Sequence, residues 1–320
     1  MNDNEIRRLF EPLWADLQGE DTFPKKRPLL AHYTSLPVLE AILQNNEVWF
    51  SHPLLMNDPE EVAFGLDTGA QLFFTSEIIK AACGSTERFN TLRNTFIYWF
   101  NRFRKEHLPD TYVFCLSEHA KEDNDGLLSM WRGYANNGKG VAIVLDTAAL
   151  VPRDESPFII AKVDYGTKEE RINWIQKRIA HFAEILEKSA VPDDKLVLCS
   201  FYFFQRLKLF AIFTKHRGFK EENEWRVVYM RDIDEAKIFD PMLGYSVGPG
   251  DAAPKLKLKI EKIAGLPETD LSLSKIIERI ILGPLSSPLA PNAVAKMLER
   301  VGLADLKDRI KRSTIPFRAA

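Results

Sequence analysis

The sequence has 320 residues, of which 45% are hydrophobic and 28% charged, and its 43 basic and 45 acidic residues give a formal net charge of −2. A chain of this length can bury a sizeable core without disulfides or metal ions. The balanced charge excludes a general attraction to nucleic acid or to anionic membranes, although it leaves room for a local basic groove.

Cysteine content and hydropathy indicate the compartment. Cys83, Cys115 and Cys199 are too few and too far apart for a disulfide framework. The N-terminus lacks the apolar run of a signal peptide, and the longest apolar region, 196–213, is interrupted by Gln205, Arg206 and Lys208. We therefore expect a soluble, cytoplasmic protein with no membrane partner.

Periodicity and turn residues predict the elements in chain order. Ser35 is placed to cap a helix that Asn45 and Asn46 end. The Gly- and Pro-rich stretch 244–254 predicts an exposed loop. Helices are predicted over 1–20, 37–44, 62–82, 86–106, 127–137, 168–188, 195–216 and 290–301, and strands over 29–33, 48–51, 112–117, 140–145, 158–165, 225–230 and 276–282.

The order of these elements predicts an α+β fold. Strands and helices interleave, but without the regular alternation of a doubly wound parallel sheet. We expect an N-terminal helix and lead-in over 1–28, followed by a single α+β domain over 29–320. Two long helical insertions are expected within that domain, at about 62–106 and 168–215.

The sequence contains none of the familiar phosphate-loop, dinucleotide, zinc-protease or serine-hydrolase motifs. Cys115, His119, Cys199 and His216 are too dispersed to indicate a tetrahedral zinc site. We therefore expect no bound metal.

Three polar residues stand out among apolar strands: His32 in LLAHYT, Tyr134 just before a strand, and Glu224 where a charged segment enters a strand. A fixed carboxylate with a histidine and an aromatic side chain can orient a nucleotide and polarise a hydroxyl. The alternative is structural: a satisfied core histidine, a packing tyrosine, and a glutamate paired with Arg226. Residue types alone leave both open.

Several strings resemble a bacterial family labelled domain of unknown function 2971. They are HYTSLPVLEAILQNNEVWFSHPLLMNDPEE, VFCLSE, LLSMWRGYANNGKGVAIVLD, FKEENEWRVVY and a tail of Ser313, Ile315, Pro316, Phe317 and Arg318. The resemblance extends from about residue 29 to 318 and implies no function by itself.

More distantly, LLAHYTSLPVLEAIL is similar to the opening strand and helix of ADP-ribosyltransferases of the His-Tyr-Glu type. MWRGYANNGKGVAIV resembles their second motif and NEWRVV their third, in the same order. This resemblance implies small mixed or antiparallel sheets of that type, here with large helical insertions, and NAD+ as the substrate.

The resemblance also implies roles. Catalytic roles fall on His32, which would hold the nicotinamide ribose, on Tyr134, which would stack on the nicotinamide ring, and on Glu224. The Glu224 carboxylate would bind the ribose 2′-hydroxyl and stabilise the oxocarbenium-like charge. Glu221 or Glu222 remains an alternative to Glu224 in this role. The residues expected to bind NAD+ are His32, Tyr33, Thr34, Ser51, Trp131, Arg226 and Arg318, the two arginines as candidate pyrophosphate ligands.

Three functions follow as hypotheses. The first is an enzyme that cleaves NAD+ and transfers ADP-ribose to a macromolecular acceptor (protein, DNA or RNA) or to water, as a toxin or phage-defence effector. The second is a non-catalytic module that binds a nucleotide or a partner protein, such as one encoded in the same operon. The third is a metal-dependent nuclease that uses Asp164 with Glu221, Glu222 and Glu224.

Overall fold

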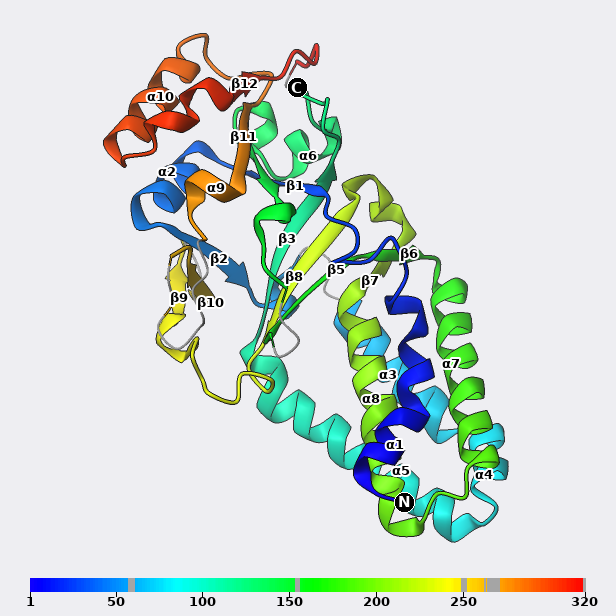
Figure 1. Cartoon of the computed structure of the whole chain (residues 1–320). Coiled ribbons are helices and arrows are strands. Elements are labelled where there is room, and N and C mark those ends of the chain that lie inside the picture. The colour runs from blue at the N-terminus through cyan, green and yellow to red at the C-terminus, as the bar shows by residue number, and fades with distance from the viewer. Residues whose placement is uncertain (57–60, 153–155, 249–251, 262, 264–270, 319–320) are drawn as a thin grey trace. The chain divides into compact units, whose positions relative to one another are not determined.

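The computed structural model describes residues 1–56, 61–152, 156–248, 252–261, 263 and 271–318 (Figure 1). The chain divides into two compact units, each assembled from separate segments. Met1–Lys25, Pro53–Thr111 and Val163–Phe219 form what we call the helical unit, and Lys26–His52, Tyr112–Lys162 and Lys220–Ala320 form the sheet unit. The predicted N-terminal helix and both predicted insertions lie in the helical unit.

The helical unit is a bundle closed at one end by two short strands that pair in parallel. The capping box of Thr167 and Glu170, in which each side chain bonds the other's backbone N–H, starts its longest helix. Its elements are α1 (Asp3–Phe10), α3 (Glu61–Phe74), α4 (Glu77–Cys83), α5 (Thr86–Arg102), β6 (Asp164–Gly166), α7 (Lys168–Lys188), α8 (Leu196–Phe213) and β7 (Thr214–His216).

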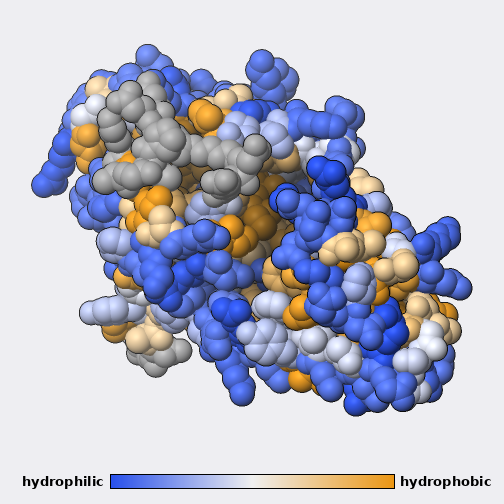
Figure 2. All heavy atoms as spheres, turned by 60° about the horizontal axis from the view of Figure 1, so that its bottom comes forward, coloured by the Kyte–Doolittle hydropathy of each residue, from blue (hydrophilic) through white to orange (hydrophobic). Residues whose placement is uncertain are grey.

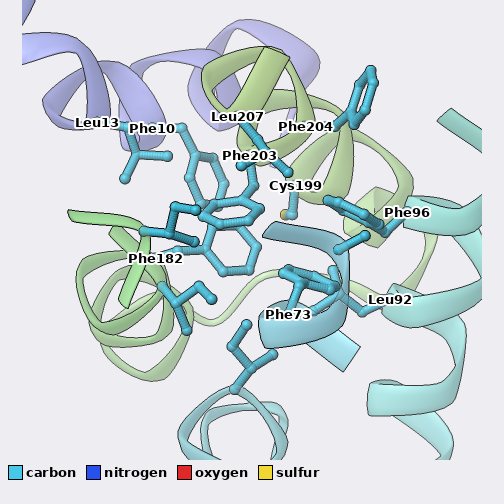
Figure 3. Packing of buried hydrophobic residues seen from close by; sticks show 14 of the residues in the cluster. Phe10, Leu13, Phe73, Leu92, Phe96, Phe182, Cys199, Phe203, Phe204 and Leu207 are labelled. Atoms are coloured by element: carbon cyan, nitrogen blue, oxygen red, sulfur yellow. The ribbon is translucent and has the colours of Figure 1, made fainter. Parts of the chain in front are cut away.

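Helix α8 is the central helix of the bundle. Among the described residues, one helix, Asp193–Phe213, is long and apolar enough to cross a membrane, and α8 lies within it. However, 67% of its most apolar 18-residue stretch is buried, as is typical of a core helix. Phe73 stacks on Phe96 with 4.3 Å between ring centroids and on Phe203 with 5.1 Å (Figure 3). Aromatic packing against α3, α5 and α7 explains why most of this helix is apolar on more than one side.

Arg206 interrupts the apolar sequence of α8, and its charge is compensated within the unit. Its guanidinium donates to the Leu13 carbonyl and to the Asp16 carboxylate, at 3.1 and 2.6 Å, and lies over the Trp174 ring. A buried charge is tolerated only when it is paired in this way. The same arginine that interrupts a membrane-like segment thus ties the N-terminal segment to the bundle.

The sheet unit is built on a mostly antiparallel sheet. In the part of the chain that the structure describes, ten strands join in the order β12-β11-β4-β1-β3-β2-β10-β9, with β8 beside β3 and β5 beside β8. The strands are β1 (Leu29–Thr34), β2 (Glu47–Ser51), β3 (Thr111–His119), β4 (Val141–Asp146), β5 (Phe158–Lys162), β8 (Glu224–Met230), β9 (Leu243–Val247), β10 (Ala252–Lys259), β11 (Ile277–Leu282) and β12 (Ile310–Arg312). Its helices are α2 (Leu36–Asn45), α6 (Leu128–Gly133), α9 (Leu273–Ile276) and α10 (Ala290–Arg300). The predicted α+β class is confirmed.

Local chemistry explains where the predictions hold and where they are wrong. Ser35 caps α2, and Asn46 ends it in the left-handed conformation (φ 53°), both as predicted. The helix predicted over 62–82 is two helices, because the Ser76 side chain accepts a bond from the Ile79 N–H and starts α4. Of the segment predicted as a loop over 244–254, residues 249–251 lie outside the described residues. The rest contains most of β9 and the start of β10, which pair with each other.

The surface follows the usual division between polar and apolar residues. Figure 2 shows hydrophilic residues over most of the displayed face, with hydrophobic residues in small groups between them. Scattered apolar residues of this kind are normal on a folded protein.

Close packing of α3 on α8 gives a stability prediction. A Cβ added at Gly65 would lie 2.6 Å from the Cα of Ala211, a backbone atom that cannot move aside independently. We expect Gly65→Ala to lower the free energy of unfolding by about 1–3 kcal/mol through overpacking. Gly19→Ala, at a position with open space around it, is the matched control. Equal urea midpoints for the two variants would contradict this packing.

Candidate functional site

Strand β1 presents its successive side chains to opposite sides of the sheet, as strands do. Ala31 and Tyr33 belong to an apolar cluster with Trp131 of α6. The His32 ring instead packs against Phe114, with 4.5 Å between ring centroids. His32 and Tyr33, both predicted to bind NAD+, therefore lie on opposite faces of β1.

His32 is held in one tautomer. Its Nδ1 lies 3.2 Å from the Cys115 carbonyl oxygen, which only accepts, so Nδ1 carries the proton. Burial lowers the pKa of His32 below its ordinary value, against a smaller opposite effect of this hydrogen bond. The imidazole is therefore neutral at pH 7, and its Nε2 lone pair is an acceptor for a hydroxyl.

Strand β3 lies between His32 and the entry of β8 and is bonded to both. On one edge of β3, β1 is registered with Ser117–His119 and His32 bonds the Cys115 carbonyl. On the β8 side, the Glu118 N–H donates to the Asn223 carbonyl, and the Ser117 hydroxyl donates to the Glu222 carbonyl at 2.7 Å. Because neighbouring strands are about 4.8 Å apart, β1 and β8 are separated by about 10 Å across β3.

Helix α6 places Tyr134 beside Glu222, at the entry of β8. The helix is anchored by the Trp131 indole, which is fully buried and donates to the Asp125 carbonyl at 2.7 Å, and by the Leu127 N–H, which donates to the Tyr33 hydroxyl at 2.9 Å. Tyr134 follows its last turn, and its hydroxyl donates to Glu222 Oε1 at 2.6 Å. Tyr134 also packs on the cluster of Ala31, Tyr33 and Trp131, so it lies on the face of the sheet opposite His32. Tyr134 and Glu222 meet beside Ser117, and His32 bonds the Cys115 carbonyl of the same strand. We call these three side chains, His32, Tyr134 and Glu222, the candidate site.

A turn at Asn223 separates two carboxylates, those of Glu222 and Glu224. Asn223 has φ 44°, in the left-handed region that asparagine adopts more readily than most residues. Glu222, before the turn, is partly exposed and meets Tyr134. Glu224, after it, is 4% exposed and bonds Arg226 through both oxygens, at 2.8 and 3.1 Å. The structure therefore places Glu224 and Arg226 in a buried ion pair, the structural alternative left open by the sequence.

Glu118 is a third carboxylate nearby, and the sequence predictions missed it. It accepts from Lys26 and Lys162, each at 2.7 Å, and from the Trp225 indole at 3.0 Å. Burial raises the pKa of Glu118, but the three donors outweigh burial and hold the pKa at about 2. A charged residue at the end of the apolar run 112–117 was the available signal.

The other predicted NAD+-binding residues have varied surroundings. Thr34 is 8% exposed at the end of β1, and Ser51 accepts a bond from Lys255 at 2.8 Å. Trp131 is in the core, while Arg318 is exposed near the C-terminus. Trp131 belongs to the apolar cluster on which Tyr134 packs, whereas the contacts of Thr34, Ser51 and Arg318 do not place them at the candidate site.

The nuclease hypothesis needs carboxylates gathered around a cation. Asp164 lies in the helical unit, whereas the three glutamates, 221, 222 and 224, lie in the sheet unit. Within the described ranges, no group of three or more His, Cys, Asp or Glu side chains has the arrangement of a metal site.

Comparison with known proteins identifies similarity over part of the chain. Residues 130–227 match a family model described as a protein of unknown function (DUF2971). The match covers less than a third of the chain, which is less than the range 29–318 expected from the sequence. It includes Tyr134, Glu222 and Glu224. No curated protein and no solved structure shows a significant match.

The buried ion pair gives a second prediction. Glu224→Gln removes the carboxylate that faces the Arg226 guanidinium, and breaking such a pair lowers the free energy of unfolding by roughly 3 kcal/mol or more. The double variant Glu224→Leu with Arg226→Met is expected to recover part of that loss. Urea unfolding followed by circular dichroism measures both. A Glu224→Gln protein as stable as the wild type would contradict the structural role.

Glu118 gives a third prediction, in acid. Its pKa in the folded protein, about 2, is below the ordinary value of 4.5. Its stabilising contribution is therefore complete above about pH 5 and is lost as the pH falls toward 2. We expect Glu118→Gln to be less stable than the wild type at pH 7, with the two proteins converging in acid. A stability difference that stays constant from pH 7 to the acid limit would count against this assignment.

Proposed function

We propose that the sheet unit binds NAD+, cleaves its nicotinamide–ribose bond and transfers ADP-ribose to a macromolecule or to water. The observation that carries the proposal is the Tyr134–Glu222 hydrogen bond beside Ser117 of β3, the strand whose Cys115 carbonyl also binds His32. These three residues occur in the order His, Tyr, Glu, which ADP-ribosyltransferases of that type share. We accordingly propose that the sheet belongs to the ADP-ribosyltransferase type.

Glu222 is better suited than Glu224 to be the reacting carboxylate. A carboxylate stabilises a developing cation when it is accessible and its negative charge is aimed at the reacting carbon. Glu224 is buried, and the Arg226 guanidinium already compensates its charge. Glu222 is partly exposed, and the Tyr134 phenol fixes its orientation.

The proposed reaction is a displacement at the ribose C1′. His32 accepts a hydrogen bond from a hydroxyl of NAD+ at Nε2 and so helps to orient the substrate. The C1′–N bond breaks, its electron pair remains on the nicotinamide, and Glu222 stabilises the positive charge that develops on the ribose. A hydroxyl, carboxylate or amine of the acceptor, or water, then forms the new bond to C1′, and any proton on the attacking atom passes to solvent.

The substrate suggests a setting. NAD+ is a cytoplasmic metabolite, and its consumption or the modification of a macromolecule harms a cell. We therefore propose a cytoplasmic toxin or phage-defence effector whose activity a partner protein from the same operon restrains.

Release of nicotinamide from NAD+, followed by chromatography with cell lysate as an acceptor source, tests the function. We expect release by the wild type and a loss of about 100-fold or more in Glu222→Gln, the scale for removing one electrostatic stabiliser. Tyr134→Phe keeps the ring but loses the bond to Glu222, so we expect a lower kcat with little change in KM.

Two outcomes would overturn the proposal. Full activity of Glu222→Gln would exclude its assigned role, with folding checked by circular dichroism. No release by the wild type, with or without lysate, would instead favour a non-catalytic nucleotide-binding module. NAD+ binding without turnover would then support that second function directly.

A further inference from the structure

At the β9 end of the sheet, an exposed tryptophan shares one face with three lysines. Strand β10 pairs with β2 so that Lys255, Lys257 and Lys259 lie opposite Ser51, Trp49 and Glu47, respectively. Because alternate residues of a strand point to the same side, the three lysines lie on one face together with Trp49. On β9, Gly244 is opposite Lys255, while Tyr245 is opposite Pro254 and so approaches this face only at its edge. We call Trp49 and these three lysines, with Tyr245 at the adjoining edge, the aromatic–lysine face.

Two aromatic rings lie near the ammonium of one of these lysines. The Lys257 ammonium lies 4.3 Å from the Trp49 ring centroid and 6.0 Å from that of Tyr245 on β9. Gly244 has no side chain, and a Cβ there would lie 3.5 Å from Lys257 Cε, so the lysine stem extends along β9 at this position. Three neighbouring strands thus contribute to one surface feature.

These rings are accessible. Trp49 is 39% exposed and Tyr245 is 67% exposed. In the described part of the sheet unit, they are the two aromatic residues among the exposed large hydrophobic side chains. An exposed tryptophan on a sheet forfeits burial that the core would provide, so its position is more informative than that of an exposed leucine.

The aromatic–lysine face has a net positive charge, and the orientation of its indole ring is fixed. Glu47 accepts from the Trp49 indole at 2.9 Å and pairs with Lys259 at 3.1 Å. This carboxylate fixes the plane of the indole and offsets one lysine charge. Lys255 donates to Ser51 and Lys257 lies near both rings, so two positive charges remain beside the aromatic rings.

We propose that the aromatic–lysine face binds single-stranded nucleic acid. Exposed aromatic rings on a sheet stack unpaired bases, and lysines beside them contact phosphates. A duplex does not fit this face, because its bases are already stacked on one another and cannot reach the rings. The proposal rests on this surface alone and is independent of the proposed NAD+ chemistry.

Fluorescence anisotropy with short labelled oligothymidylate and oligouridylate tests the proposal, and the two oligomers distinguish DNA from RNA. We expect binding that weakens between about 50 and 200 mM salt. Base stacking contributes about 1–3 kcal/mol, so Trp49→Ala should weaken binding roughly 5- to 150-fold. Trp49→Phe should recover part of the loss, and Lys257→Ala should reduce the salt dependence of the affinity.

Matched controls lie elsewhere on the chain. Tyr98→Ala removes an aromatic side chain that is 53% exposed in the helical unit, and Lys311→Ala removes an exposed lysine of β12. Neither is expected to change the affinity. All variants replace exposed or partly exposed residues, and circular dichroism confirms their folding.

Three results would overturn the proposal: no oligonucleotide binding by the wild type, equal affinities of the wild type and Trp49→Ala, or equal losses in the control variants. Self-association that depends on Tyr245, measured by sedimentation in the absence of oligonucleotide binding, would assign the face to a protein contact instead. Strand β9 is the last strand in the sheet order and exposes Val247. An edge strand with an exposed apolar residue is where a second protein chain would pair, so this alternative has a defined place on the sheet.

Discussion

Strand β3 is paired along both of its edges, and this pairing positions the rest of the candidate site. Strands β1 and β2 share one edge, and β8 occupies the other. His32 bonds a carbonyl of β3 between the β1 and β2 ladders, and the entry to β8 is fixed by bonds from Ser117 and from the Glu118 N–H. A displacement of β3 would therefore move the histidine and the carboxylates together.

Three glutamates within this small region illustrate how surroundings determine what a carboxylate can do. Glu118 is surrounded by two lysines and an indole N–H, which keep it ionised far into acid. Glu224 faces one buried guanidinium, and Glu222 faces a phenol at the surface. The first two contribute to the fold, while the third keeps the accessibility that chemistry requires.

Much of the fold could be predicted from local patterns. The apolar runs around Ala31, Phe114, Ile143 and Ile280 are the central strands, and Ser35 with Asn46 determined the ends of α2. Pairing between distant segments could not be predicted in this way. Glu118 meets Lys26 across 92 positions of sequence, and β9 and β10 form strands within a segment whose glycines and proline are typical of a loop.

The candidate site was predicted in part. His32 and Tyr134 were singled out from their positions beside apolar runs, and Glu222 was kept as an alternative to Glu224. The choice between those two glutamates depends on the left-handed turn at Asn223 and on the bidentate contact with Arg226, neither of which a spacing of two residues reveals. The opposite orientations of His32 and Tyr33 follow from strand alternation, once β1 is known to be paired on both sides.

Nitrogen-15 NMR of the histidine rings, with and without NAD+, tests the central claim most directly, and His32→Gln identifies the resonance. We expect His32 to carry its proton on Nδ1, to remain neutral to a lower pH than an ordinary histidine, as its lowered pKa requires, and to show a shifted Nε2 signal when NAD+ is added. A proton on Nε2, or an unchanged His32 signal at NAD+ concentrations that saturate any binding, would contradict the placement of NAD+ beside β3.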